Sequence, residues 1–257
     1  MDHARTRTRR TRSLLCAIAG LALVSTVVHA LAVVVPLSQP GVQGVPAAQA
    51  NLSAEALAKA EASALPAEIP LFPLPETSLF PGTSRPFQIY EPRYREMIAD
   101  ALKDHKIIGM VLLRPGFEKD YEGRPPIYGI GCAGVIEKYQ LLPDGRYLIL
   151  LRGLTTFRIV GEDQRKPYRL ARVEAVAELL KDDERVTLSA LRNRIEKLLY
   201  AVLPFGAEPP DPSLDDDEFV NIVAQNLDMA ESDRQDLLER NSLVARARAL
   251  VERLERR

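Results

Sequence analysis

Six prolines interrupt the segment from Ile69 to Met97, IPLFPLPETSLFPGTSRPFQIYEPRYREM, and they constrain the fold more than any other feature of the sequence. Proline cannot donate a hydrogen bond to a β ladder, so it occurs in edge strands, at strand starts and in bulges. The segment therefore predicts an edge strand over Ile69–Leu74, which contains Pro73, and a second strand over Pro86–Tyr90. Between them, Pro81 and Gly82 predict a turn, because glycine readily adopts a positive φ.

One helix is predicted to follow directly, inserted among the strands. Pro92 suits the first position of a helix, where its missing N–H costs nothing. Glu91 and Arg93 on either side are interpreted as structural residues that fix the junction between strand and helix. Apolar residues then recur at helical spacing and predict one buried face. They are Tyr94, Met97, Ile98, Ala101 and Leu102.

Short apolar runs continue the β pattern to residue 177. They are Ile107–Leu113, Tyr128–Leu142, Arg146–Leu151, Thr155–Val160 and Arg169–Ala177. Glycines 129, 131 and 134 predict a bulge in the second run, and no helix follows their G-x-G-x-x-G spacing, which excludes a dinucleotide site. Pro143, Asp144 and Gly145 predict a hairpin turn. Six or so short strands and one helix predict a small, strongly bent sheet or barrel.

The period of the apolar residues changes after about residue 182. Four amphipathic helices with short links predict a small bundle over residues 182–257. Ser213 is predicted to cap the second of these helices, with Asp216 at the capping-box position.

The N-terminus predicts targeting rather than a folded domain. Five arginines precede an apolar run, Leu14–Leu37, whose 24 residues are enough to span a bilayer, which takes about 20. A cleaved signal peptide, with Ala48–Ala50 as the cleavage pattern, and an uncleaved membrane anchor both remain open. Either one predicts an exported protein, periplasmic, secreted or anchored by residues 14–37, and an organelle transit peptide is a third alternative. Residues 38–66 predict an Ala/Pro-rich linker.

The remainder of the sequence predicts no catalytic chemistry. The formal net charge of −1 gives no electrostatic footprint for nucleic acid. With His105 and Cys132 as the only residues of their kinds after residue 50, no metal site, cofactor or nucleophile is expected. We interpret Cys132 as a small buried residue and His105 as a surface residue.

A long loop over residues 114–127, RPGFEKDYEGRPPI, is the best candidate for a binding surface. It is rich in proline and glycine, and aromatic residues lie in it and beside it. Loops of this kind often bind, although an ordinary connection is the alternative. The candidate binding residues are Tyr90, Tyr94, Phe117, Tyr121 and Tyr128.

Several of these segments together resemble the N-terminal, substrate-binding domain of the Lon protease family. They are the proline-rich opening, GMVLL (109–113), GIGCAGVIEKYQLLPDGRYLILLRGLTTFRIV (129–160) and YRLARVE (168–174), so the resemblance covers roughly residues 67–180. We assign structural roles to ten residues within it. They are Pro73, Pro81, Gly82, Glu91, Pro92, Arg93, Tyr94, Asp144, Gly145 and Gly153.

The resemblance implies an α+β fold, with a PUA-like β pseudo-barrel and one inserted helix over 67–181, followed by the helical bundle over 182–257. It implies a non-catalytic module that binds unfolded or exposed polypeptide segments. An adaptor for one envelope protein and a small-molecule enzyme on a PUA-like barrel are the alternatives. The full proteases also carry an ATPase and a peptidase. This sequence has no G-x-x-x-x-G-K-[ST] motif, so the resemblance implies neither ATP use nor proteolysis here. The oligomeric state stays open.

Overall fold

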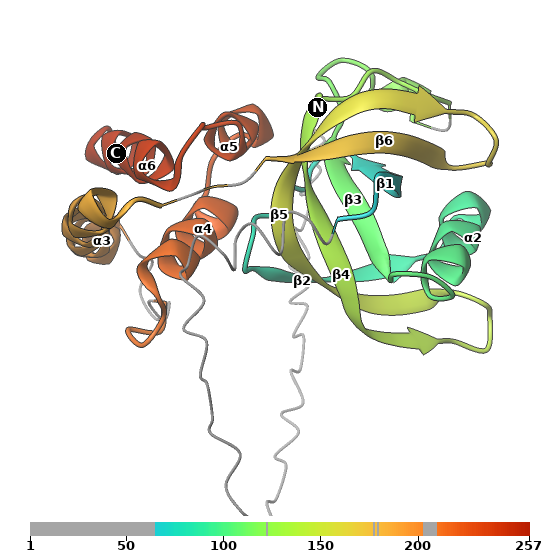
Figure 1. The fold of residues 1–257 in the computed structure, drawn as a ribbon, viewed down its shortest axis with the longest axis horizontal. Helices are drawn as coiled ribbons and strands as arrows, with labels where there is room; N and C mark the ends of the chain where they lie inside the picture. The colour runs from blue at the N-terminus through green and yellow to red at the C-terminus, as the bar shows by residue number, and fades with distance from the viewer. Residues whose placement is uncertain (1–64, 122, 177, 179, 203–209) are drawn as a thin grey trace, which may run out of the picture. The chain divides into compact units, whose positions relative to one another are not determined.

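The computed structural model describes residues 65–257, apart from residues 122, 177, 179 and 203–209 (Figure 1). The arginine-rich start, the apolar run 14–37 and residues 38–64 of the predicted linker lie outside the described residues. Within the part that is described, no helix is long and apolar enough to cross a membrane.

Six strands in the described residues form one mixed sheet in the order β2-β5-β4-β3-β1-β6, and β6 also pairs with β5. Five strands therefore close into a ring, and β2 extends it beyond β5. The pairing of β1 with β3 is parallel and the others are antiparallel. This confirms the predicted bent sheet. The strands are β1 (Glu68–Leu74), β2 (Ser84–Ile89), β3 (Ile107–Leu112), β4 (Ile130–Leu141), β5 (Tyr147–Asp163) and β6 (Arg169–Val176).

The prediction that the first strand lies at an edge is wrong, because β1 has partners on both sides. It pairs with β6 over residues 68–71 and with β3 over residues 71–74. Pro70 and Pro73 therefore each lie in a half of the strand that has one partner. The loss of one N–H donor at each proline is tolerated because a single ladder runs through each half.

The two strands predicted over 146–151 and 155–160 are one continuous strand, β5. Gly153 lies within it, donates its N–H to the carbonyl oxygen of Thr83 and accepts from the N–H of Gly82. A Cβ atom at this position would lie 2.1 Å from the carbonyl oxygen of Phe80. Glycine is thus required here because the turn after Leu79 packs directly on the strand, not because the strand ends.

The predicted turns and the inserted helix are present. Gly82 and Gly145 have φ angles of 75° and 82°, in the left-handed region that favours glycine. The register between β4 and β5 shifts next to Gly134, as expected for a bulge. Helix α2 (Pro92–Ala101) begins at Pro92, and Tyr94, Met97, Ile98 and Ala101 on its apolar face are buried.

Four further helices follow in the described residues after β6, as predicted: α3 (Asp182–Val202), α4 (Asp216–Asn226), α5 (Glu231–Leu238) and α6 (Leu243–Glu255). Figure 1 shows them gathered on one side of the sheet, with α2 on the other. Ser213 does not cap α4, whose N-cap residue is Asp215. Instead Asp211 accepts hydrogen bonds from the N–H and the hydroxyl of Ser213, which hold Ser213 in the preceding turn.

Two hydrophobic cores stabilise the fold. The larger one joins the sheet to the helices and includes Phe80, Cys132, Phe219 and Leu250. The smaller one draws on every strand of the closed ring, as side chains that face the inside of a ring would. Its buried members are Ile69, Leu71, Val111, Ala133, Phe157, Ala171 and Val173.

Polar contacts also join the sheet to the helices. The carbonyl of Gln225 on α4 accepts from Arg85 on β2, and its side-chain oxygen accepts from the Phe80 N–H. Gln235 on α5 donates to the carbonyl of Ile130. Because these groups are buried or half-buried, their hydrogen bonds are needed to offset the loss of water.

Candidate functional site

The loop over residues 114–127 connects β3 to β4 and is closed at its base by backbone hydrogen bonds. Leu113 and Ile127 form an isolated antiparallel bridge. The Arg114 N–H donates to the carbonyl of Pro126 at 2.9 Å, and the Tyr128 N–H donates to the carbonyl of Leu112 at 2.9 Å. A single turn of 3₁₀ helix, Glu118–Asp120, lies inside the loop.

The Arg93 side chain ties the start of α2 to this loop. Its guanidinium lies 2.9 Å from the Glu91 carboxylate, donates to the carbonyl of Tyr121 at 2.9 Å and donates to the carbonyl of Gly123 at 3.3 Å. It also lies over the rings of Tyr94 and Tyr121, at 4.5 and 5.0 Å from their centroids. Arg93 therefore does more than fix a junction of strand and helix, because it sets the position of the loop backbone.

Two more arginines fix the opposite side of the loop. The Arg169 side chain on β6 is buried, pairs with Glu162 at 3.0 Å and donates to the carbonyl of Pro125. Arg124 reaches from the loop to the carbonyls of Asp163 and Lys166, at 3.3 and 3.1 Å. Contacts from α2, β6 and the β5–β6 turn therefore anchor Tyr121 and residues 123–125 of the loop, and anchoring of this kind lowers the entropy cost of binding.

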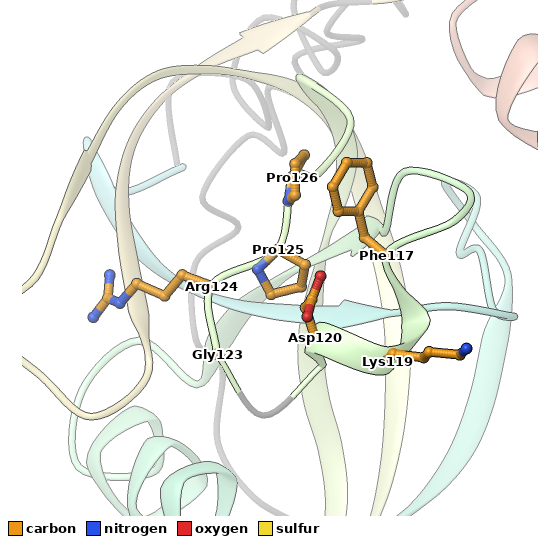
Figure 2. Close-up of a pocket in the computed structure, with 7 residues that line it drawn as sticks. All are labelled: Phe117, Lys119, Asp120, Gly123, Arg124, Pro125 and Pro126. Carbon is orange, nitrogen blue, oxygen red and sulfur yellow. The ribbon is translucent and has the colours of Figure 1, made fainter.

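A cavity of about 400 Å³ lies in this loop, within the size range of ligand pockets. Figure 2 shows the Phe117 ring and the two proline rings around it, while Arg124 and Lys119 extend away to opposite sides. Phe117 is 39% exposed. The lining residues are Phe117, Lys119, Asp120, Gly123, Arg124, Pro125 and Pro126.

The five aromatic candidates do not form one surface. Tyr94 and Tyr121 lie together, with ring centroids 6.3 Å apart, and burial raises the pKa of both hydroxyls. Tyr94 is buried against Phe72, which places it in the core and not on a binding surface. Phe117 lines the cavity.

The other two candidates lie outside the cavity. Tyr128 packs under Arg114, whose guanidinium lies 4.3 Å from the ring centroid. Tyr90 is 65% exposed at the end of β2. Of the five candidates, Phe117 is the one that the structure places in the lining of the cavity.

Sequence reasoning missed most of the lining. Lys119, Asp120 and Arg124 are ordinary charged loop residues in the sequence, and Pro125 and Pro126 indicate only a loop. The adjacent prolines were the available signal, since they hold the backbone rigid and present apolar rings.

The remaining candidate groups carry no reactive geometry. Cys132 is fully buried, and burial raises the pKa of its thiol, which disfavours the reactive thiolate. His105 is exposed and lies 3.3 Å from Asp104. In the described part of the chain, no group of three or more His, Cys, Asp or Glu residues is arranged to hold a metal ion.

Comparison with known proteins identifies relatives of the chain. It is 28% identical over 200 residues to a Lon protease of Anaeromyxobacter dehalogenans (strain 2CP-C) and 30% identical over 200 residues to Lon protease 2 of Myxococcus xanthus. Each alignment covers 75% of this chain and 24% of the relative, so the chain spans about a quarter of the length of these curated relatives.

The fold is also found in a solved structure. The N-terminal domain of Mycobacterium avium complex Lon protease matches with a TM-score of 0.57 and 15% identity, over 73% of this chain and 98% of that one. The likeness shows a shared α+β fold. Residues 68–256 match the family model of the ATP-dependent protease La (LON) substrate-binding domain. The chain therefore belongs to the family of Lon substrate-binding domains.

Proposed function

We propose that the chain is a non-catalytic module that binds unfolded or exposed polypeptide segments, and that the loop 114–127 contributes the binding surface. The observation that carries the proposal is the cavity beside Phe117, in a chain whose family is that of a substrate-binding domain. Unfolded polypeptides expose apolar side chains and backbone groups that folded proteins bury, so a pocket that combines apolar rings with charged groups can discriminate between the two.

The composition of the pocket supports this preference. Phe117, Pro125 and Pro126 offer apolar surface for a side chain of the bound segment. Lys119 and Asp120 offer charged and hydrogen-bonding groups beside it. Arg93 and Arg169 donate hydrogen bonds to the carbonyls of Gly123 and Pro125 in the pocket lining, and such anchoring reduces the ordering required when a polypeptide binds.

The finer description of the architecture belongs to the same proposal. We assign the β part, 67–181, to a PUA-like pseudo-barrel and residues 182–257 to a helical-bundle subdomain, with 38–66 as linker. The closed ring of five strands in the described residues supports the first assignment, and the contacts of α6 with α3, α4 and α5 support the second.

We also propose that residues 14–37 direct export or anchor the protein in a membrane. Five preceding arginines and the length of the apolar run support this. Mass spectrometry of the intact protein from the cell envelope distinguishes a cleaved signal peptide from an anchor, and recovery from the cytosol would contradict both.

The binding proposal is tested by fluorescence anisotropy with the full chain. Labelled, permanently unfolded polypeptides are titrated, and the same proteins in their folded state are the control. We expect saturable binding of the unfolded forms in the micromolar range or tighter, and none of the folded forms. Equal binding of both forms, or of neither, would contradict the proposal.

The cavity volume favours one second candidate, a small-molecule site, because about 400 Å³ is also the size of a metabolite pocket. A ligand that raises the melting temperature of a chain that binds no polypeptide would select this alternative.

A further inference from the structure

The C-terminal half of β4 has a strand partner on one side only within the described residues. β4 pairs with β3 through Cys132–Val135, and the Ile136 N–H then donates to the carbonyl of Lys106 at 2.8 Å. The register against β5 shifts after Ile136, and residues 138–141 pair with β5 alone among the described strands. The β4–β5 hairpin thus extends beyond the start of β3 (Figure 1), and its β4 side is a sheet edge.

The backbone groups of Tyr139 and Leu141 point out from this edge. The Leu142 N–H donates to the carbonyl of Arg146 on the other arm of the hairpin, at 2.8 Å. Because the bonding direction alternates along an antiparallel ladder, Gln140 also bonds toward β5, while the N–H and C=O groups of Tyr139 and Leu141 face away from it. The edge therefore presents a donor and an acceptor at two alternate positions, which is the spacing that another strand requires.

The same two residues also expose apolar side chains. The Tyr139 side chain is 55% exposed and that of Leu141 is 57% exposed. Because they are two positions apart, they lie on the same face of the strand. A strand added at this edge would place its own alternate side chains directly beside them, as cross-strand neighbours.

The free edge of β2 differs in this respect. β2 is the last strand of the sheet order beyond β5, and the Gly153 N–H donates to the carbonyl of Thr83 just before β2 begins. By the same alternation, Pro86 turns its nitrogen to the outer side of β2, where it offers no donor. Proline at this position is one of the devices that protect an edge from pairing. The C-terminal half of β4 contains no proline.

Charge contributes little to the selectivity of the β4 edge. The Glu137 carboxylate pairs with Arg152 at 2.6 Å, and the Asp144 carboxylate pairs with Arg146 at 2.7 Å. Lys138 is exposed but lies on the opposite face of the strand from Tyr139. Backbone hydrogen bonds and apolar contacts are therefore what this edge offers to a ligand.

We propose that the β4 edge at Tyr139–Leu141 binds an extended segment of an unfolded polypeptide as an added antiparallel strand. Such binding takes its affinity from main-chain hydrogen bonds and its preference from alternate side chains. Folded proteins have these main-chain groups already paired, so the edge selects unfolded chains. The proposal rests on the proposed function, which supplies the ligand, and it adds a second contact surface at the opposite end of β4 from the loop 114–127.

The hydrogen-bonding pattern is tested on the full chain with the peptide KTVTVTK, with blocked termini, followed by amide chemical shifts. We expect saturable shifts at residues 136–141. In antiparallel pairing, the residues beside Tyr139 and Leu141 turn their own N–H groups toward β4, and the valines are expected there because they match the apolar face. A peptide N-methylated at both valines should therefore not bind, whereas one N-methylated at the threonines that follow them should bind as the parent peptide does. Equal binding of the two N-methylated peptides, or no shifts at 136–141, would overturn the proposal.

Two substitutions at one position test the edge itself. Tyr139→Pro removes the ring and the outward N–H, and proline is tolerated in an edge strand where the N–H faces solvent. Tyr139→Ala is the matched control, because it removes the ring and keeps the N–H. We expect Tyr139→Ala to weaken peptide binding about twofold to fivefold and Tyr139→Pro to weaken it by about a further tenfold. Equal affinities of the two variants, with unchanged melting temperatures, would overturn the proposal, and the N-methylated peptides test it without any substitution.

Two further outcomes separate this proposal from its neighbours. Analytical ultracentrifugation shows whether a second copy of the chain occupies the edge. A dimer that is lost in Tyr139→Pro and that the peptide does not dissociate would overturn the proposal. If unfolded polypeptides bind Tyr139→Pro and Tyr139→Ala equally well in the anisotropy assay, this proposal fails and the proposed function stands. If they do not bind the original protein, the proposed function itself fails.

Discussion

The side chain of Glu178 should determine how firmly the helices are held on the sheet. It lies between β6 and α3, and its carboxylate accepts from two nitrogens of Arg246 on α6, one of them at 2.8 Å. Arg246 is 0% exposed and Glu178 is 15% exposed. Arg246 also donates to Asn221 on α4 at 2.7 Å and to the carbonyl of Leu237 at 2.9 Å.

Glu178→Gln removes the negative charge and retains the shape of the side chain. Removal of one partner of a buried ion pair costs about 3–5 kcal/mol, because the other charge stays buried. Asn221 and Leu237 continue to accept from Arg246, which places the expected loss at the lower end, about 3 kcal/mol. For a domain of this size, that lowers the melting temperature by roughly 6–12 °C.

Urea unfolding of the full chain, followed by far-ultraviolet circular dichroism, measures this loss. Glu252→Gln is the matched control, because Glu252 forms an exposed pair with Arg256 and should cost under about 0.5 kcal/mol. If Glu178→Gln costs no more than this control, the buried pair does not hold the helices on the sheet and the reasoning fails.

Three further predictions use the same unfolding and binding assays. Gly153→Ala should lower the free energy of unfolding by about 2 kcal/mol or more, since the new Cβ would lie 2.1 Å from the Phe80 carbonyl oxygen. The control Gly129→Ala, whose Cβ would have nothing within 4 Å, should be nearly neutral. Equal losses of stability in the two variants would contradict the packing described. Arg93→Lys should weaken polypeptide binding severalfold, because lysine cannot replace a planar guanidinium that contacts Glu91, Tyr121 and Gly123. The control Arg158→Lys, at an exposed arginine on β5, should leave binding unchanged. Unchanged binding in both variants would show that the position of the loop is irrelevant to binding. Hydrogen bonds from Lys166 and Tyr168 hold the pKa of Asp100 below its ordinary value of 3.8, so the ionised carboxylate stabilises the fold above that pH, and this stabilisation is lost as the pH falls through the lower folded-state pKa. Asp100→Asn should therefore be less stable than the original protein at pH 7, and the difference should shrink in acid. A difference that stays constant with pH would refute this.

Most of the secondary structure could be predicted because the local signals are strong. Pro92 marks the start of α2, Gly82 and Gly145 mark turns that need a positive φ, and the change from a period of two to one of 3.6 marks the later helices. The partners of β1 could not be predicted. Whether a proline-containing strand has a neighbour on each side depends on how its halves pair with strands far along the chain.

The same limit applies to Gly153 and Ser213. Glycine in a strand can signal a break or a close approach, and only the position of Phe80 decides between them. Ser213 is a good helix cap by type, but the Asp211 carboxylate competes for its N–H and hydroxyl. Local sequence gives the available options, and tertiary contacts select among them.

For the candidate site, the sequence predicted the loop but not which of its residues line the pocket. Composition marked residues 114–127 as unusual. The helical spacing predicted that Tyr94 is buried, which the structure confirms, and this conflicts with its choice as a candidate binding residue. The sequence could not show that Arg93 and Arg169 reach the loop from α2 and β6. These contacts join residues 28 and 44 positions apart, a separation at which side-chain type carries no pairing information.

The most direct test of the account is photo-crosslinking from the cavity itself. A benzoylphenylalanine replaces Phe117 in the full chain, and a second protein carries it at Tyr200, an exposed aromatic residue on α3. Each is irradiated with a labelled unfolded polypeptide and with the same protein folded. The account predicts a crosslink from position 117 to the unfolded form only, and little from position 200. Equal crosslinking from both positions, or none from position 117 while the polypeptide is bound, would contradict it.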